Sequence, residues 1–321
     1  PGPGQILGRH GAAPRLRGDA PRARGLGAGQ HAPLPCLPAG DGPPGVKDSS
    51  RLRRNYLVAD FDADARSLGT ALVREAAVHI QAEHDPADHV RETAWLQAVA
   101  DAPASAGTPQ AIVANADLAA PDAARVLEAH CAFRNTRGIR QALHRGLHAS
   151  PRYDPLDDPA FRRGFPLLER MGLSFDLQFF QEQGERVAAL VRGHPGVQFI
   201  LTHCGMPLSL DSGHLALWRG NLRGLAELPN VAVKISGFGL WAPGWDAATV
   251  REFGGRCIDL FGIERCMLAS NFPVERLHTP YDQVWLTYAQ AFADLNAAER
   301  EALFAGNARR IYRIASKEQH L

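Results

Sequence analysis

The chain has 321 residues, of which 45% are hydrophobic and 21% are charged, and this composition is typical of a globular protein with a sizeable core. It contains no run of roughly 20 apolar residues, which a membrane helix needs, and no recognisable signal peptide. The formal net charge of +1 hides an asymmetry, because residues 1–54 hold nine Lys and Arg against three acids, while the remainder holds 26 against 31. We therefore expect a cytoplasmic protein whose main partner is neither a membrane nor a nucleic acid.

Residues 1–54 differ in composition from everything that follows. Residues 1–50 contain eleven Gly and nine Pro, and no aromatic residue precedes Tyr56. Such a segment buries too little apolar surface to offset the entropy lost on ordering. We therefore predict a poorly ordered N-terminal segment over 1–54 and a folded domain over 55–321. The Gly, Pro, Ala and Arg bias is also what an incomplete or out-of-frame translation of GC-rich DNA would give, with a native flexible arm as the alternative.

Seven short β-rich runs alternate with helical stretches from residue 58 onward. The helical stretches 183–193 and 248–262 repeat apolar residues on one face, as amphipathic helices do. This alternation is typical of a parallel sheet covered by helices, and seven units fall one short of a (β/α)₈ TIM barrel. We predict an α/β barrel of this type. The predicted strands are 75–83, 110–116, 137–143, 173–179, 197–205, 230–237 and 265–271.

Polar side chains stand at the carboxyl ends of these predicted strands. In parallel barrels the reactive groups lie at that end, where the loops open to solvent. Repetition over seven strands favours one shared site, although a polar residue that merely satisfies a strand end is the alternative for each of them. The candidates are His79, Gln81, Glu83, Asn115, Arg140, Gln178, His203, Lys234 and Asn271.

Four of these candidates suit the hydrolysis of an acidic ester or lactone. His203 and His79 could hold a divalent cation or move a proton, because a neutral imidazole nitrogen does either near neutral pH. Arg140 offers a planar fork for a substrate carboxylate. Lys234 could polarise a carbonyl group or attract an anion.

The loop 237–245, GFGLWAPGW, follows the predicted strand 230–237. It places Trp241 and Trp245 beside Gly and Pro at the expected mouth of the barrel. Aromatic side chains in such a loop could cover a planar ligand, so Trp241 joins the substrate-binding candidates. The alternative is that both rings pack on neighbouring helices.

Six runs of the chain resemble the amidohydrolase-2 family of TIM-barrel metal-dependent hydrolases, which includes sugar lactonases and pyrone-dicarboxylate lactonase. The resemblance covers about residues 52–315, with the runs in the family's order. They are AVHIQAEHDPADHVRETAWLQAVA, GIRQAL, FILTHCGMP, VAVKISGFG, RCMLASNFPVERL and LFAGNARRIYR.

The resemblance implies a distorted (β/α)₈ TIM barrel, with its first strand missing or degraded in this chain, that hydrolyses a small lactone, ester or amide. Family members that use a metal hold it with a His-x-His pair on the first strand, a His at the position of His203 and an Asp on the last strand. That Asp is also the base that activates water, while Arg140 would hold the substrate's carboxylate. The resemblance thus implies one divalent ion, Zn or Mn, with His203 as a ligand.

Two departures from the family pattern affect this expectation. Residues 1–54 contain His10 and His31 but no His-x-His pair, and Asn271 stands where the family has its last-strand Asp. Asn is not a general base and binds metals more weakly than a carboxylate does. We expect Asn271 to orient water or substrate by hydrogen bonds, with His203, His79 or Glu83 as the base, and a metal-independent reaction is the alternative.

The leading prediction is therefore a lactonase-like hydrolase that acts on a small acidic molecule. One alternative is a metal-dependent decarboxylase of the same superfamily, against which the carboxamide of Asn271 counts. The other is a catalytically impaired barrel that lacks the His-x-His pair. Either a monomer or a homo-oligomer is compatible with the sequence.

Overall fold

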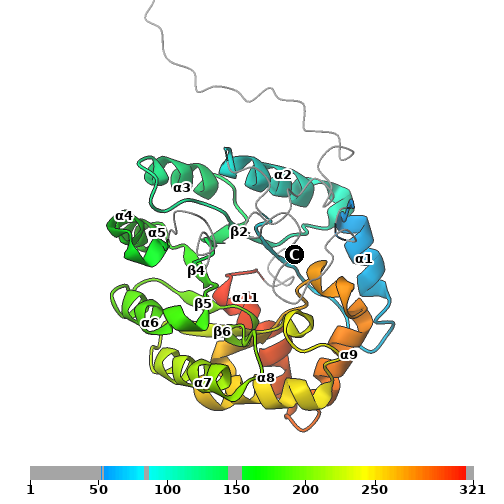
Figure 1. The fold of residues 1–321 in the computed structure, drawn as a ribbon. Helices are drawn as coiled ribbons and strands as arrows, with labels where there is room; N and C mark the ends of the chain where they lie inside the picture. The colour runs from blue at the N-terminus through cyan, green and yellow to red at the C-terminus, as the bar shows by residue number, and fades with distance from the viewer. Residues whose placement is uncertain (1–51, 53, 83–86, 144–153, 316–321) are drawn as a thin grey trace, which may run out of the picture.

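A computed structural model describes residue 52 and residues 54–82, 87–143 and 154–315. Seven parallel strands form one curled sheet in the order β1 to β7, and helices surround it as an outer layer (Figure 1). The predicted α/β barrel is confirmed, and all seven predicted strands are present in shorter form. They are β1 (Val78–Ile80), β2 (Ala111–Ala114), β3 (Thr136–Ile139), β4 (Ser174–Leu177), β5 (Phe199–Leu201), β6 (Val231–Ile235) and β7 (Cys266–Leu268).

The helices begin and end at ordinary sequence signals. Asp88, Asp211 and Asp246 each precede a helix and accept a hydrogen bond from a backbone N–H of its first turn, which satisfies one of the donors left free there. The helices are α1 (Val58–Arg66), α2 (His89–Asp101), α3 (Ala123–Cys131), α4 (Pro159–Arg163), α5 (Phe165–Arg170), α6 (Gly184–Arg192), α7 (Ser212–Ala226), α8 (Ala247–Phe261), α9 (Tyr281–Ala291), α10 (Ala297–Glu301) and α11 (Asn307–Ile311).

Alternate residues of each strand face two different apolar layers, because successive side chains of a strand point to opposite faces of the sheet. Phe199 and Leu201 of β5 pack in the larger layer, between sheet and helices. Ile200 packs inside the barrel in a smaller cluster with Ala232 of β6 and Met267 of β7. This alternation decides which polar residues at the strand ends enter the barrel.

The C-terminal helix α11 closes the lower part of the barrel interior. Ile311 and Tyr312 belong to the inner cluster and are 7% and 1% exposed. Asn307 anchors this helix, since its side chain donates to the backbone oxygens of Ile263 and Cys266, both at 2.8 Å. In Figure 1 the red helix α11 lies at the centre of the ring.

The sheet is open between β7 and β1, since no pairing joins these two strands within the described residues. The first strand of a complete barrel would belong here. The prediction that it is missing or degraded concerns residues 1–54, of which the structure describes only residues 52 and 54. In the outer layer α1 stands between α9 and α2 (Figure 1), with Phe61 packed edge-on against Tyr281 at 5.7 Å. Helix α1 therefore bridges the opening on the outside of the sheet.

Among the helices of the described ranges, none combines the length and the apolar character that spanning a bilayer requires.

Candidate active site at the carboxyl ends of the strands

Three of the predicted strand-end residues have side chains that point into the barrel. Ile139 and Leu177 belong to the outer apolar layer, so Arg140 and Gln178, one residue later, point into the barrel. Lys234 lies between the outward-facing Val233 and Ile235 and is 5% exposed. Charge-bearing side chains therefore gather inside the upper part of the barrel.

Gln81 and Arg140 are held together across the sheet. The Arg140 guanidinium donates from Nη2 to the backbone oxygen of Gln81 at 2.6 Å, and Nε2 of Gln81 lies 3.5 Å from the backbone oxygen of Arg140. Gln81 is 2% exposed. This contact fixes the guanidinium between the ends of β1 and β3.

Lys234 lies beside a buried carboxylate below this level. Its Nζ donates to Oδ2 of Asp176 at 2.5 Å, and the hydroxyl of Tyr312 donates to the same carboxylate at 3.2 and 3.3 Å. Burial lowers the pKa of Lys234, Asp176 raises it, and Arg140 lowers it further. The floor of the site is therefore the ion pair between Lys234 and Asp176, with Tyr312 hydrogen-bonded to Asp176.

His203 sits on a strained turn directly after β5. His203, Cys204 and Met206 all have φ between 52 and 54°, a left-handed conformation that costs a non-glycine residue about 1–2 kcal/mol. The turn is held from outside, because Nε1 of Trp218 donates to the Cys204 oxygen at 2.7 Å and Nε2 of Gln181 to the Met206 oxygen at 3.1 Å. Strain kept in place in this way is typical of functional sites.

The imidazole of His203 is buried and electrically neutral. Its Nδ1 lies 2.9 Å from Oγ of Ser236, at the end of β6. Burial lowers the pKa of His203 to about 3, and the positive charges of Arg140 and Lys234 lower it in the same direction. His203 therefore presents an uncharged ring next to two cations.

Gly237 makes room for this ring. Its φ is +72°, and a Cβ atom added there would stand 2.6 Å from Nδ1 and 2.8 Å from Cγ of His203. Any side chain at this position would push the imidazole out of its place. The glycine of the run KISG is therefore part of the site.

Asn271 begins the segment after β7 with another left-handed residue, at φ 55°. Its side chain lies beside Glu275, which is 1% exposed. The Glu275 carboxylate accepts hydrogen bonds at Oε1 from the backbone N–H of Gly239 at 2.8 Å and from Nε1 of Trp245 at 3.0 Å. Glu275 thus connects the Asn271 turn to the loop that follows β6.

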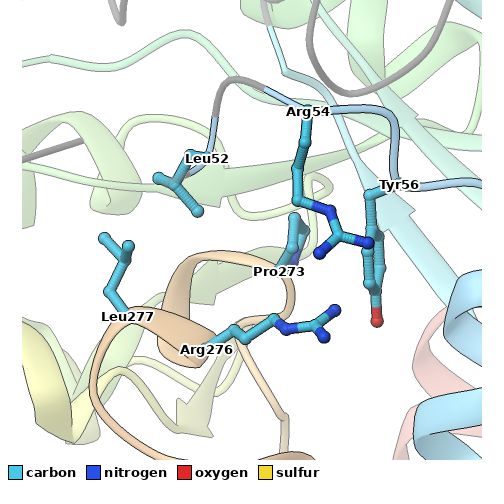
Figure 2. Close-up of a pocket in the computed structure, with 6 residues that line it drawn as sticks. All are labelled: Leu52, Arg54, Tyr56, Pro273, Arg276 and Leu277. Carbon is cyan, nitrogen blue, oxygen red and sulfur yellow. The ribbon is translucent and has the colours of Figure 1, made fainter. Parts of the chain in front are cut away.

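A surface hollow borders the segment after Asn271 (Figure 2). Nη2 of Arg54 lies 3.5 Å from Asp60, and Nη1 of Arg276 lies 3.5 Å from Asp64, which also accepts from the Tyr56 hydroxyl at 2.6 Å. Both guanidinium groups therefore have partners on α1, and the hollow joins α1 to the segment after β7. It is lined by Leu52, Arg54, Tyr56, Pro273, Arg276 and Leu277.

The structure does not bring His79 to the inside of the barrel. Val78 and Ile80 pack against the inner cluster, so His79 between them points outward. There Nε2 lies 3.0 Å from Oε1 of Glu92 on α2. The prediction that His79 could hold a cation or move a proton in the site does not agree with this position, because its ring faces α2 on the outside of the sheet.

Trp241 also differs from its expected place over an open mouth. It is 5% exposed and packs against Phe238 and Phe253, with ring centroids 5.2 and 4.7 Å apart. The alternative of packing on neighbouring helices is correct here, because the turn η7 (Phe238–Leu240) directs the indole toward α8. Glu83 lies outside the described residues.

Three residues that contribute to the site were not singled out as candidates. Ser236 stands two positions after Lys234, at the end of the same strand, and Glu275 lies in the segment after Asn271. Tyr312 lies more than 130 positions from Asp176 in the chain. No local sequence pattern predicts such contacts, because they depend on how distant segments of the chain pack together.

Potential ligands for a divalent cation are few in the described part of the chain. No group of three or more His, Cys, Asp or Glu side chains gathers there in a way that could hold a metal ion. His203 contributes one imidazole, and its neighbours Arg140 and Lys234 are cations that repel a metal ion. Asp176 is already paired with Lys234.

Comparison with known proteins gives a consistent result along nearly the whole chain. A family model described as amidohydrolase matches residues 34–314. An uncharacterized protein, y4mH, from Sinorhizobium fredii is 38% identical over 284 residues, covering 87% of this chain and 93% of the relative. The L-fucono-1,5-lactonase of Burkholderia multivorans is 34% identical over 279 residues, covering 82% of this chain and 88% of that enzyme.

A solved structure agrees with the fold. An amidohydrolase from Burkholderia multivorans, crystallised with bound zinc, superposes with a TM-score of 0.72 at 30% identity, covering 88% of this chain and 94% of that one.

Proposed function

Since this chain belongs to the amidohydrolase family, we propose that it hydrolyses a small lactone that carries a carboxylate, at the carboxyl ends of its strands. The family match covers residues 34–314 and supports a hydrolase at the level of the family. The similarity to an L-fucono-1,5-lactonase supports a lactone rather than an amide. The carboxylate is inferred from the charges around His203.

One observation carries the proposal, namely a neutral imidazole beside two cations. Arg140 and Lys234 both lower the pKa of His203, so both lie close enough to act on it. An anionic substrate that entered this region would be attracted mainly by Arg140, because Asp176 offsets the charge of Lys234, and a guanidinium binds a carboxylate with good geometry. Arg140 at the end of β3 is the residue we assign to that carboxylate.

The bound anion would also prepare His203 for proton transfer. A pKa of about 3 makes the free imidazole a weak base. A carboxylate beside Arg140 offsets one of the positive charges that lower this pKa, and the pKa therefore rises when substrate binds. Nδ1 of His203 lies 2.9 Å from Oγ of Ser236. In the tautomer whose Nδ1–H donates to that hydroxyl, Nε2 is left to accept the proton of a water molecule.

The reaction then proceeds by addition and ring opening. The water oxygen attacks the lactone carbonyl carbon while Nε2 of His203 takes its proton, and the ring C–O bond breaks. The leaving oxygen receives that proton, which yields a hydroxy acid. Asn271 would orient the water or the carbonyl group by hydrogen bonds, with no charge of its own.

A metal such as the zinc of the Burkholderia structure does not fit the described residues. One imidazole and a carboxamide are too few and too weak as donors for a tightly held ion, and Arg140 and Lys234 stand next to that imidazole.

The test is a panel of carboxylated lactones, neutral sugar lactones including L-fucono-1,5-lactone, open-chain esters and amides. Acid release is followed with a pH indicator for the wild-type chain and for His203→Ala, with Glu264→Gln as an exposed control. We expect turnover of carboxylated lactones that falls by about 10²- to 10⁴-fold in His203→Ala. No turnover of any lactone, or equal rates in both chains, would overturn the proposal.

A further inference from the structure

The role of Asn271 depends on which end of its carboxamide faces the barrel mouth. The side chain has a donor end, Nδ2, and an acceptor end, Oδ1. A donor at the mouth would bind a carbonyl or an oxyanion, whereas an acceptor would bind the O–H of a water molecule. The neighbours of the two atoms decide between these arrangements.

Glu275 supplies an acceptor on one side of that carboxamide. Its Oε1 is occupied by the N–H of Gly239 and by Nε1 of Trp245. The backbones of the two residues are also joined, since the N–H of Glu275 donates to the backbone oxygen of Asn271 at 2.9 Å. The second carboxylate oxygen, Oε2, is buried and has no partner among the other described residues.

Nδ2 of Asn271 is the matching donor. It too is buried, and it has no partner among the other residues that the structure describes. The two atoms do not reach full hydrogen-bond geometry, yet Asn271 lowers the pKa of Glu275 as a hydrogen-bonding neighbour, against the larger opposing effect of burial. A small rotation of the carboxamide would let these two unsatisfied buried atoms, one donor and one acceptor on neighbouring side chains, bond to each other.

We propose that Glu275 is a positioning residue that holds Nδ2 of Asn271 and thereby turns Oδ1 toward the barrel mouth. Asn271 then offers an acceptor to the water that attacks the substrate, and it orients that water without taking its proton. This catalytic consequence rests on the proposed hydrolysis, whereas the orientation of the carboxamide does not. Glu275 itself stays behind Asn271 and does not touch the substrate.

A purely structural role for Glu275 would give a different outcome in one substitution. Glu275→Gln keeps an oxygen that can accept from Gly239 and Trp245, but it places an N–H group where Oε2 faces Nδ2 of Asn271. Two donors then oppose each other and the carboxamide is driven to turn. A residue that only fastens the loop after β6 would tolerate this exchange.

The experiment is a double-mutant cycle with Asn271→Asp, Glu275→Gln and the double variant, measured by thermal unfolding at pH 7. Asn271→Asp sets two carboxylates against each other and Glu275→Gln two donors, so we expect each to lower Tm by roughly 3–8 °C. The double variant restores one donor and one acceptor and should recover most of that loss. Additive losses would overturn the proposal, and Glu264→Gln serves as the exposed control.

Two further readouts separate this proposal from the proposed function. On a lactone that the wild-type chain hydrolyses, Glu275→Gln should lower kcat about tenfold or more with little change in KM, and an unchanged kcat would overturn the positioning role. In wild-type protein the Asn271 side-chain amide protons should be protected from exchange in an NMR spectrum, and rapid exchange would overturn it even if the variants fail to fold. Non-additive stability in a chain that hydrolyses no lactone would support the positioning of Asn271 while defeating the hydrolase proposal.

Discussion

Replacing Lys234 by Met should leave a buried negative charge in the barrel floor. Asp176 is 0% exposed and Lys234 5%, so water cannot take over the lost interaction. Breaking a buried ion pair from one side costs about 3–5 kcal/mol. For a folded unit of this size, 1 kcal/mol corresponds to roughly 2–4 °C in Tm, and we therefore expect Lys234→Met to unfold roughly 6–20 °C below the wild-type chain.

A cycle of variants shows whether the loss comes from the stranded charge. The double variant Lys234→Met, Asp176→Leu removes both charges, and it should be more stable than Lys234→Met alone. Arg125→Met breaks an exposed pair with Asp122, where the side chains are 74% and 50% exposed, and it should change stability by about 0.5 kcal/mol or less. Thermal unfolding followed by circular dichroism measures all three variants. A Lys234→Met midpoint equal to that of the wild-type chain would refute the reasoning.

Four more predictions follow from the surroundings of His203. Ser236→Ala removes the partner of Nδ1 and should cost about 1–3 kcal/mol in urea unfolding; no change would mean that this contact is absent. Gly237→Ala forces a Cβ to 2.6 Å from Nδ1 and should lower lactone turnover more than it lowers Tm, whereas full activity would contradict the close approach. Burial lowers the pKa of His130 to about 4 and that of His203 to about 3, while both histidines bind protons near pH 6.5 in the unfolded chain. The free energy of unfolding should therefore fall as the pH drops from 6.5 to 4, by up to about 1.4 kcal/mol per pH unit for each histidine. A Tm that stays constant across this pH range would contradict this expectation. EDTA treatment followed by added Zn²⁺ should leave Tm and acid release unchanged, and a loss that zinc restores would show that a metal site exists.

The barrel was predictable because its signals are local. Apolar runs such as 197–205 and helical stretches such as 248–262 each reveal their own period, and their order predicts a parallel sheet. The predicted positions of the strand ends were less accurate. The observed β5 ends at Leu201, because the left-handed turn at His203 terminates the pairing.

Only the location of the site could be predicted from the sequence, because the carboxyl ends of the strands converge in a parallel barrel. Arg140 and Lys234 lie near enough to His203 to lower its pKa, and the roles assigned to these three residues stay predictions. His79 was misjudged because the side-chain direction depends on register, and one position along a strand reverses the face. The partners Tyr312 and Glu275 were missed because their contacts join elements that are distant in the chain or hidden in a turn.

The central claim is that an anionic substrate is bound at Arg140 beside a neutral His203. It is tested most directly by kcat/KM for a carboxylated lactone and for its methyl ester, in the wild-type chain and in Arg140→Gln. The account predicts that the wild-type chain prefers the acid by about 10- to 100-fold, as a charge-assisted hydrogen bond would give, and that Arg140→Gln loses this preference. Equal rates for acid and ester in the wild-type chain, or an undiminished preference in Arg140→Gln, would contradict it.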